Sequence, residues 1–190
     1  SLKFIKQKIN PDMYALSAAS FNEKLMVDGI AKTKKKVVIR TGGATLNEIQ
    51  NVVNTFKKHN NQNFTLLHGI QVYPTSVNEI NLNQLITLKK KFRCNVGLAD
   101  HIDGSSKFAK YLPSLAIPFG IEIIEKHITL DRNEKSEDFE SALDPSNFKE
   151  MVEMINLSLK SIGKKEFSNL SKAEKKYRQV SRKRTVAKKI

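Results

Sequence analysis

The chain has 190 residues, of which 39% are hydrophobic and 27% are charged, and its formal net charge is +14. This length corresponds to one ordinary domain with or without a tail, and the hydrophobic share is large enough for a buried core. The sequence has no run of 18 apolar residues, which excludes a transmembrane helix, and its single cysteine, Cys94, excludes an internal disulfide. Because residues 1–10 lack a signal-peptide pattern, we expect a reducing, cytoplasmic setting.

Most of the positive charge lies near the C-terminus. Residues 160–189 contain twelve Lys or Arg and two acidic residues, which accounts for about +10 of the net charge. Such a segment can bind nucleic acid or acidic lipid, or it can be a solvated connector. Because it matches no nucleic-acid-binding module, we favour the solvated connector and expect neither nucleic acid nor membrane as a partner.

Five short apolar runs predict strands. In chain order they are residues 3–9 (KFIKQKI), 36–40 (KVVIR), 64–69 (FTLLHG), 95–100 (NVGLAD) and 121–127 (IEIIEKH). Their starts lie 33, 28, 31 and 26 residues apart. The even spacing predicts repeated units of one strand and one helix.

The segments between the runs have the periodicity of amphipathic helices. Their apolar stripes fall at residues 46–56, 85–92, 107–117 and 148–159. Thr45 and Glu48 have the spacing of a capping box, and Asp144-Pro145 places a good N-cap before a proline at the first helical position. Pro113 is expected to kink or interrupt the third of these helices.

Strand–helix alternation with continuous apolar strands predicts a parallel α/β fold. Two architectures fit it, a doubly wound sheet or part of a (β/α)8 barrel. Both place their chemistry at the C-terminal ends of the strands. The residues that follow each run are therefore the candidates, and they are Asn10-Pro11-Asp12, Arg40-Thr41-Gly42-Gly43, residues 68–73, Ala99-Asp100-His101 and Glu125-Lys126-His127.

The segment Arg40-Thr41-Gly42-Gly43 permits two interpretations. Glycines let a backbone approach a ligand closely, and the helix start that follows offers free N–H groups to an anion. The same glycines also suit a tight strand-to-helix turn with no ligand. The motif alone does not decide between these alternatives.

His101 and His127 are 26 residues apart, which corresponds to one strand–helix unit. Neighbouring strand ends lie about 4.8 Å apart, so both imidazoles can converge on one Mn²⁺, Fe²⁺, Co²⁺ or Zn²⁺ ion, or they can be hydrogen-bonded rim residues. Asp100 and Glu125 flank them as candidate ligands or supporting groups. Lys126 alternates away and is expected to face the helices or the solvent.

The other residues that invite attention have simpler interpretations. Tyr73 can donate a hydrogen bond to a sugar or carboxylate, or it can be a packed loop aromatic. His68 lies within a predicted strand and is interpreted as structural, His59 as a solvated loop residue, and Cys94 as a structural thiol with no basic partner.

Five segments in this order resemble the sialic acid synthase family: LLHGIQVYPT, NLNQLITLKKKF, VGLADH, IEKHITLD and SALDPSNFKEMV. The earlier segments PDMY and TGGATLNEI are also similar to it. The family comprises N-acetylneuraminate synthases and relatives that make legionaminic and pseudaminic acids or spore-coat polysaccharide. The resemblance spans nearly the whole chain, and its specificity comes from the ordered set of motifs.

The resemblance implies a (β/α)8 TIM barrel followed by a small antifreeze-like (SAF) domain. Residues 1–163 would supply roughly strands 4–8, and residues 164–190 would be the linker. The implied reaction condenses phosphoenolpyruvate with an N-acylated sugar aldehyde such as N-acetylmannosamine, giving a nine-carbon 2-keto sugar acid and phosphate. The implied cofactor is Mn²⁺, with Mg²⁺ or Co²⁺ as alternatives. The full-length enzyme is expected to be a homodimer, and the chain alone is expected to be an inactive internal fragment.

The resemblance also assigns roles to individual residues. His101 and His127 match the metal ligands, and Glu125 and Tyr73 match catalytic positions. The substrate-binding positions that it implies are Arg40, Thr41, Gly42, Gln71, Tyr73 and Asp138. This sequence departs from the family pattern in the expected phosphate contacts, with Arg40 where many members have Ser, Gln71 where some have Asn and Ala99 where some have Ser. Two other functions remain open, a non-enzymatic nucleic-acid or anion-binding module acting through the basic tail and another metal-dependent aldolase-like barrel.

Overall fold

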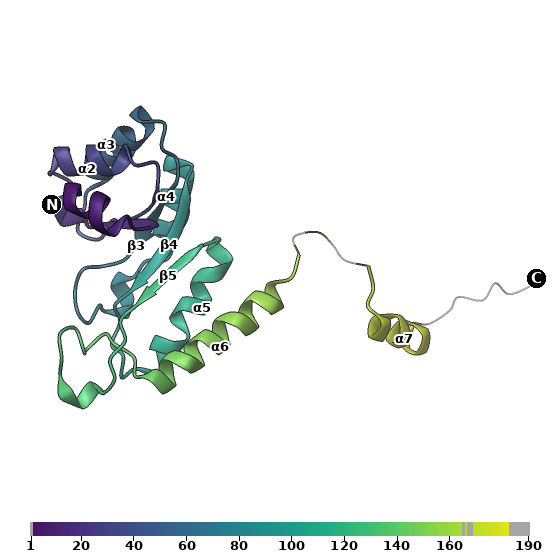
Figure 1. Ribbon diagram of the computed structural model, residues 1–190. Coiled ribbons are helices and arrows are strands. Elements are labelled where there is room, and N and C mark those ends of the chain that lie inside the picture. Colours follow the sequence, from purple (N-terminus) through teal and green to yellow (C-terminus); the bar gives the residue numbers. More distant parts are fainter. Residues whose placement is uncertain (1, 165, 167–168, 183–190) are drawn as a thin grey trace, which may run out of the picture.

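Five parallel strands form one sheet in the order β1-β2-β3-β4-β5 in a computed structural model, which describes residues 2–164, 166 and 169–182 (Figure 1). The strands are β1 (Met13–Leu16), β2 (Lys36–Arg40), β3 (Phe64–His68), β4 (Asn95–Asp100) and β5 (Ile123–Lys126). The helices are α1 (Leu2–Phe4), α2 (Lys24–Ala31), α3 (Leu46–Lys58), α4 (Asn83–Phe92), α5 (Leu112–Ala116), α6 (Pro145–Ile162) and α7 (Lys172–Ser181). The sheet curls into a half-barrel with helices on its outer face, which confirms the prediction of a partial barrel.

The first predicted strand is wrong. Residues 3–9 lie in α1 and in a π-helical turn, Ile5–Ile9, and the first strand is β1 at residues 13–16. Phe4, Ile5 and Ile9 are also spaced as on a helix, so the apolar pattern of this short run fits both structures. Asn10, at φ +46°, ends the π-helical turn. The segment Asn10-Pro11-Asp12 therefore lies at the N-terminal end of β1, and not at the C-terminal end of a strand as predicted.

The main core lies between the outer face of the sheet and the helices. Alternate strand residues point into it, among them Leu16, Ile39, Leu66 and Leu98, each at most 1% exposed. Burying a side chain of this size stabilises the fold by roughly 1.5–3 kcal/mol. The remaining strand residues therefore face the hollow of the half-barrel, where Val38, Leu67 and Ala99 make a smaller apolar cluster with Ile123.

The predicted helix starts are confirmed. Thr45 and Glu48 form a reciprocal capping box at the start of α3. At the start of α6, Asp144 Oδ1 accepts a hydrogen bond of 2.9 Å from Asn147 N. This backbone contact, together with hydrogen bonds from Ser146 and from the Asn147 side chain, lowers the pKa of Asp144 to about 2. Pro113 lies in the first turn of α5, which follows the short 3₁₀ helix Lys107–Lys110, so the break in this segment falls just before the proline.

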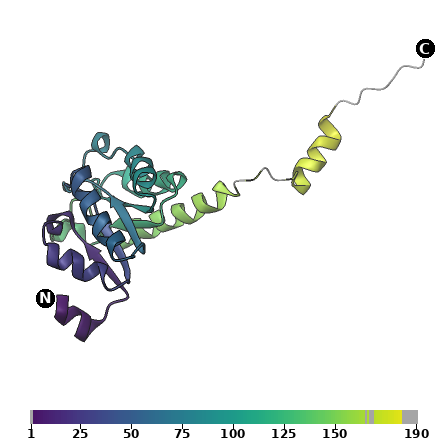
Figure 2. The same cartoon turned by 90° about the horizontal axis from the view of Figure 1, so that it is seen from above.

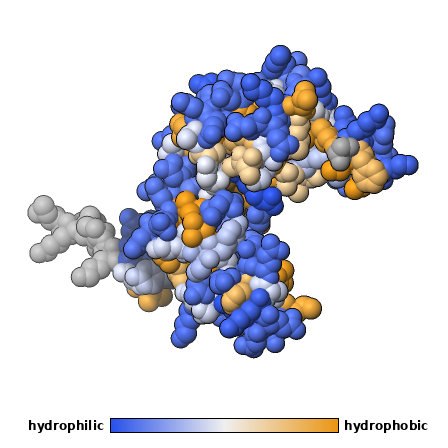
Figure 3. Space-filling view, turned by 90° about the vertical axis from the view of Figure 1, so that its left-hand side faces the viewer, coloured by the Kyte–Doolittle hydropathy of each residue, from blue (hydrophilic) through white to orange (hydrophobic). Residues whose placement is uncertain are grey.

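A last helix, α7, stands apart from the sheet in both ribbon views (Figures 1 and 2). It is not among the predicted helices, although Ser171 and Glu174 form a capping box at its start. It lies within the predicted linker, of which residues 165, 167–168 and 183–190 are outside the described residues. In the part of the chain that the structure describes, no helix is both long and apolar enough to cross a membrane. The face in Figure 3 carries separate apolar patches among hydrophilic side chains.

Candidate active site

Arg40 and Glu125 meet in the hollow of the half-barrel. Arg40 Nε lies 2.9 Å from both carboxylate oxygens of Glu125, and Arg40 Nη2 lies 2.7 Å from Oε2. The hydrogen bonds to Glu125 raise the pKa of Arg40. Arg40 ends β2 and Glu125 lies in β5, so the curl of the sheet brings together two side chains separated by two strands.

Three aromatic rings cluster beside this ion pair, at the C-terminal ends of β3, β4 and β5. The ring centroids of His101 and His127 are 5.2 Å apart. The ring of Tyr73 lies 4.5 Å from that of His101 and 5.4 Å from that of His127. The two histidines therefore lie side by side at neighbouring strand ends, as their spacing predicts, and Tyr73 belongs to the same cluster. Their convergence on one metal ion stays a prediction.

His101 is held from several sides. Its Nδ1 lies 2.8 Å from the carbonyl of Ile70, and since a carbonyl only accepts, Nδ1 carries the hydrogen and Nε2 keeps its lone pair. The carbonyl of His101 accepts hydrogen bonds of 2.7 Å from Thr75 N and from Ser141 Oγ. Burial lowers the pKa of His101, which favours the neutral imidazole that binds metals.

Asp138 approaches the cluster from the loop after β5. Its Oδ2 lies 3.6 Å from His127 Nδ1, and its backbone adopts the left-handed φ of +58°. Arg132 holds this loop in shape by donating to the carbonyls of Phe139 (2.6 Å) and Ala142. The sequence places Asp138 in this loop but gives no sign of the role of Arg132, because the contact depends on how the loop closes.

Tyr73 also contacts Gln71, since its hydroxyl donates to Gln71 Oε1 at 2.5 Å. Burial raises the pKa of Tyr73, and the nearby carboxylates of Asp138 and Glu125 raise it further. The hydroxyl therefore stays protonated at neutral pH and remains a hydrogen-bond donor. Tyr73 thus links Gln71 to the histidine cluster, and the substrate contacts that the resemblance predicts for these two residues stay predictions.

The glycine segment after β2 is a tight turn. Ala44 N donates to Thr41 O at 3.0 Å, and Gly43 has φ +80°. A Cβ on Gly42 would lie 2.6 Å from the carbonyl oxygen of Gly69. Thr41 is 6% exposed, and its hydroxyl donates to Leu67 O at 2.9 Å. The structural requirement for glycine is therefore present, and the predicted substrate contacts of Thr41 and Gly42 stay predictions.

Asp100 does not point at the histidines, so its interpretation as a direct ligand is wrong. Strand alternation turns it to the helix-covered face, where Asp100 Oδ2 lies 3.0 Å from Lys126 Nζ. Burial lowers the pKa of Lys126, and the charge of Asp100 opposes that shift. Of the two directions expected for Lys126, the helices and the solvent, it takes the helices, with its side chain 1% exposed.

The two histidines fit part of a metal site. Both supply nitrogen donors of the kind that Mn²⁺, Co²⁺ and Zn²⁺ accept, and the Nδ1–H of His101 is fixed by a carbonyl, as in many metal-binding histidines. Within the described ranges, no group of three or more His, Cys, Asp or Glu is arranged to hold an ion. The arrangement is therefore a two-histidine one, whose further ligands would come from water or substrate.

The remaining histidines and the cysteine have structural surroundings. His68 is 7% exposed, its Nε2 donates to Ile80 O at 2.6 Å, and burial lowers its pKa, so the structural interpretation is confirmed. Burial also raises the pKa of the Cys94 thiol to about 11, which keeps it protonated. The interpretation of His59 as solvated is wrong, because His59 Nε2 lies 2.5 Å from Asp28 Oδ1 at the end of α3.

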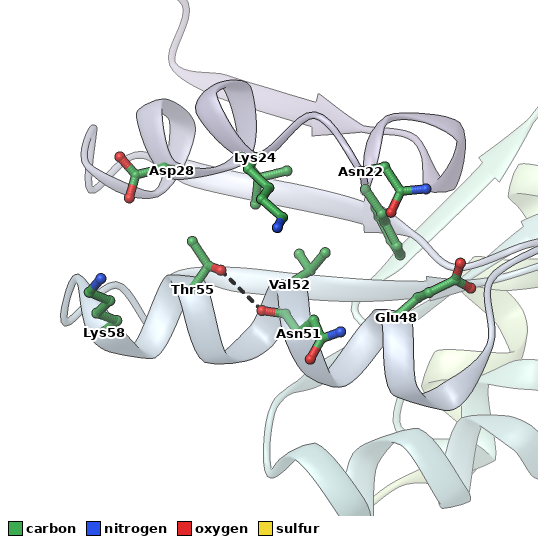
Figure 4. Close-up of a pocket in the computed structure, with 10 residues that line it drawn as sticks. Asn22, Lys24, Asp28, Glu48, Asn51, Val52, Thr55 and Lys58 are labelled. Atoms are coloured by element: carbon green, nitrogen blue, oxygen red, sulfur yellow. Dashed lines mark hydrogen bonds between the residues drawn. The ribbon is translucent and has the colours of Figure 1, made fainter.

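A second cavity lies on the helical layer, between α2 and α3 (Figure 4). It has a volume of about 370 Å³, and both of its acids have local partners. Asp28 pairs with Lys32 and His59, and Glu48 belongs to the capping box of α3. Because the lining of this groove includes none of the residues that directly follow the strand ends, the cluster in the half-barrel is the better candidate for chemistry.

Comparison with known proteins agrees with this geometry. The NeuB family model matches residues 1–167. A pseudaminic acid synthase of Campylobacter jejuni is 33% identical over 162 residues, which cover 85% of this chain and 46% of that protein. An N,N'-diacetyllegionaminic acid synthase of the same species is 37% identical over 162 residues, covering 84% and 47%. The chain thus spans about half the length of these relatives.

Solved structures give the same result. The N-acetylneuraminic acid synthetase of Leptospira borgpetersenii superposes with a TM-score of 0.78 at 28% identity, over 94% of this chain and 61% of that one. The half-barrel described above therefore has the same fold as the matching part of this synthetase. Since the family model extends over residues 1–167, the chain belongs to the NeuB family.

Proposed function

We propose that this chain carries the strand-end site of a synthase that condenses phosphoenolpyruvate with an N-acylated sugar aldehyde to a nine-carbon, sialic-acid-type 2-keto sugar acid. The observation that carries the proposal is the cluster of Tyr73, His101 and His127 at three neighbouring strand ends. Relatives named pseudaminic acid synthase and N,N'-diacetyllegionaminic acid synthase support it. An N-acetylmannosamine-like sugar is the expected acceptor.

His101 and His127 would hold a divalent cation in this proposal, with Mn²⁺ preferred and Mg²⁺ or Co²⁺ as alternatives. Such an ion acts as a Lewis acid that polarises the oxygen of an aldehyde. The neutral state of His101, favoured by burial, leaves its Nε2 available as a ligand. The contact between Asp138 and His127 would orient the second ring.

Arg40 would bind the negative charge of phosphoenolpyruvate. Two of its nitrogens, Nε and Nη2, contact Glu125. The third nitrogen, Nη1, is the one that would donate to the anion. A guanidinium suits carboxylate and phosphate because it presents several donors in one plane. Gly42 would let the turn approach the same anion closely. The positive charge of Arg40 would compensate for the phosphate contacts that change where this sequence has Gln71 in place of Asn and Ala99 in place of Ser.

Glu125 and Tyr73 would handle protons and hydroxyl groups. Glu125 lies in the hollow as a carboxylate already ordered by Arg40, so it can accept a proton from a water or from a sugar hydroxyl. The hydroxyl of Tyr73 can exchange its bond to Gln71 for one to the substrate. Asp138, in the covering loop, is placed to accept a hydrogen bond from a sugar hydroxyl.

We further propose that the active form is a homodimer in the cytoplasm, with a closed barrel. In the described sheet, β1 and β5 each pair on one side only, and open edges of this kind need a further strand or a cover. The 190-residue chain alone is therefore expected to turn over slowly or not at all. Membrane and nucleic acid are not expected partners.

The test measures phosphate release from phosphoenolpyruvate in the presence of N-acetylmannosamine and Mn²⁺. It compares the 190-residue chain with a chimera in which residues 1–162 replace the matching segment of the Campylobacter jejuni pseudaminic acid synthase, supplied with that enzyme's own acceptor as well. We expect turnover from the chimera and its loss in the chimera carrying His101→Ala. A folded chimera that is inactive, or one indifferent to His101→Ala, would refute the proposed function.

A further inference from the structure

A buried ion pair lies directly behind the two histidines, on the helix-covered side of the sheet. Lys126 Nζ and Asp100 Oδ2 are 3.0 Å apart, and the two side chains are 1% and 0% exposed. Each residue immediately precedes one of the histidines, and the two are register partners of β4 and β5. Because a buried charge needs its partner, this pair favours one register of the two strands.

The pair is also tied to the chain that follows His101. Asp100 Oδ1 accepts a hydrogen bond of 3.0 Å from Ile102 N, and Lys126 Nζ lies 3.5 Å from Ile102 O. Asp100 Oδ2 has no well-aligned hydrogen bond among the described residues, so the ammonium of Lys126 is the group that compensates its charge. The ion pair therefore fixes the exit of β4 against the end of β5.

We propose that Asp100 and Lys126 are positioning residues of the candidate metal site, whose ion pair holds the ends of β4 and β5 so that the rings of His101 and His127 face each other. The proposal rests on the proposed function, because it gives the pair a role in that site. Two apolar side chains of similar volume would fill the same space. An apolar pair would, however, tolerate small shifts of β4 along β5. The same shifts would pull the two opposite charges of the ion pair apart, so the ion pair resists them and keeps the two rings together.

The test uses the double variant Asp100→Asn with Lys126→Met. Both replacements are close in shape to the originals, the asparagine oxygen keeps the bond to Ile102 N, and both charges are lost together, so neither remains buried alone. The first readout is the nuclear Overhauser contact between the ring protons of His101 and His127 in the 190-residue chain without metal. We expect this contact in the original chain and at least a twofold loss of its intensity in the double variant.

The matched control removes a lysine–carboxylate pair of the helical layer. Lys110 and Glu150 are paired at 2.5 Å, and Glu150 is 56% exposed. The variant Lys110→Met with Glu150→Gln should keep the ring contact. Lys126→Arg, which retains a positive charge opposite Asp100, should also keep most of it. An unchanged contact in the double variant would overturn the proposal, and so would a double variant that does not fold, because the pair would then serve the fold as a whole.

The second readout is the binding of Mn²⁺, followed by electron paramagnetic resonance of the free ion. We expect the affinity to fall about tenfold in the double variant, as when an outer partner of a metal-binding histidine is removed, and to stay unchanged in the Lys110/Glu150 control. If the original chain binds no Mn²⁺, the proposed function fails at its metal step. The ring contacts would still decide the positioning role, so the two failures are distinguishable.

Discussion

Arg40 and Glu125 form a two-point ion pair across the hollow of the half-barrel, although β3 and β4 lie between their strands. In a flat sheet, three strand spacings would separate their backbones by about 14 Å. The curl shortens this path enough for the side chains to meet. The pair therefore sets an anion-binding guanidinium beside a carboxylate in the same hollow as the histidine cluster.

Replacing the two partners should affect phosphoenolpyruvate binding differently. Arg40→Met removes the proposed anion contact and should weaken binding by about tenfold or more, the usual scale for a charge-assisted bond. Glu125→Gln releases the guanidinium and should leave binding unchanged or tighter while it abolishes turnover. Calorimetric titration of the active chimera measures both effects. Equal weakening in the two variants would show that Arg40 does not bind the anion.

Tyr73→Phe separates the ring of Tyr73 from its hydroxyl. The ring contacts with His101 and His127 should persist, so we expect the melting temperature to change by no more than about 2 °C. The hydroxyl now bonded to Gln71 would be missing, and kcat of the chimera should fall by about tenfold or more. A kcat equal to that of the unmodified chimera would reduce Tyr73 to a packing role.

Gly42→Ala should destabilise the fold through a backbone collision. The new Cβ would lie 2.6 Å from the carbonyl oxygen of Gly69, which has little freedom to move. Overpacking of this kind costs about 1–3 kcal/mol, or roughly 2–4 °C in melting temperature for each kcal/mol in a chain of this size. The matched control is Gly43→Asn. A Cβ there meets nothing within 4 Å, and asparagine tolerates the positive φ. Equal melting temperatures for Gly42→Ala and the parent would contradict the close approach.

The buried His68 should make the fold sensitive to acid. Its pKa in the folded chain lies below the ordinary 6.5, so below about pH 6.5 the unfolded chain binds more protons than the folded one. The contribution of His68 is thus complete above that pH and declines as the pH falls toward the folded-state pKa. Urea unfolding of the parent and of His68→Gln between pH 8 and pH 5 should show a difference that shrinks with acid. A difference constant over this range would argue against a depressed pKa.

Part of the fold and site follows from the sequence because parallel strand–helix units repeat regularly. That repeat is sufficient to place His101 and His127 at neighbouring strand ends. Alternation alone also turns Lys126 to the helices, and the same rule applied to Asp100 turns that residue away from the histidines, against its interpretation as a ligand. These are local rules, and they succeed where a residue's direction depends only on its own strand.

The features that the sequence does not predict depend on longer-range geometry. The meeting of Arg40 and Glu125 requires the curvature of the sheet, and the pairing of His59 with Asp28 requires the packing of α3 on α2. The first predicted strand is misplaced because residues 3–9 fit both a strand and a helix pattern. The strand lies instead at residues 13–16, where Tyr14 and Leu16 are buried and the backbone pairs with β2.

The most direct test of the central claim is Mn²⁺ binding to the 190-residue chain, measured by electron paramagnetic resonance for the parent, His101→Ala, His127→Ala and His68→Ala. We predict one bound ion in the parent and a loss of affinity of tenfold or more in each of the first two variants. Folded His68→Ala should keep the parent's affinity, because the His68 ring of the parent bonds to Ile80 on the other side of the sheet. Unchanged Mn²⁺ affinity in both His101→Ala and His127→Ala would contradict the assignment of these strand ends as the metal site.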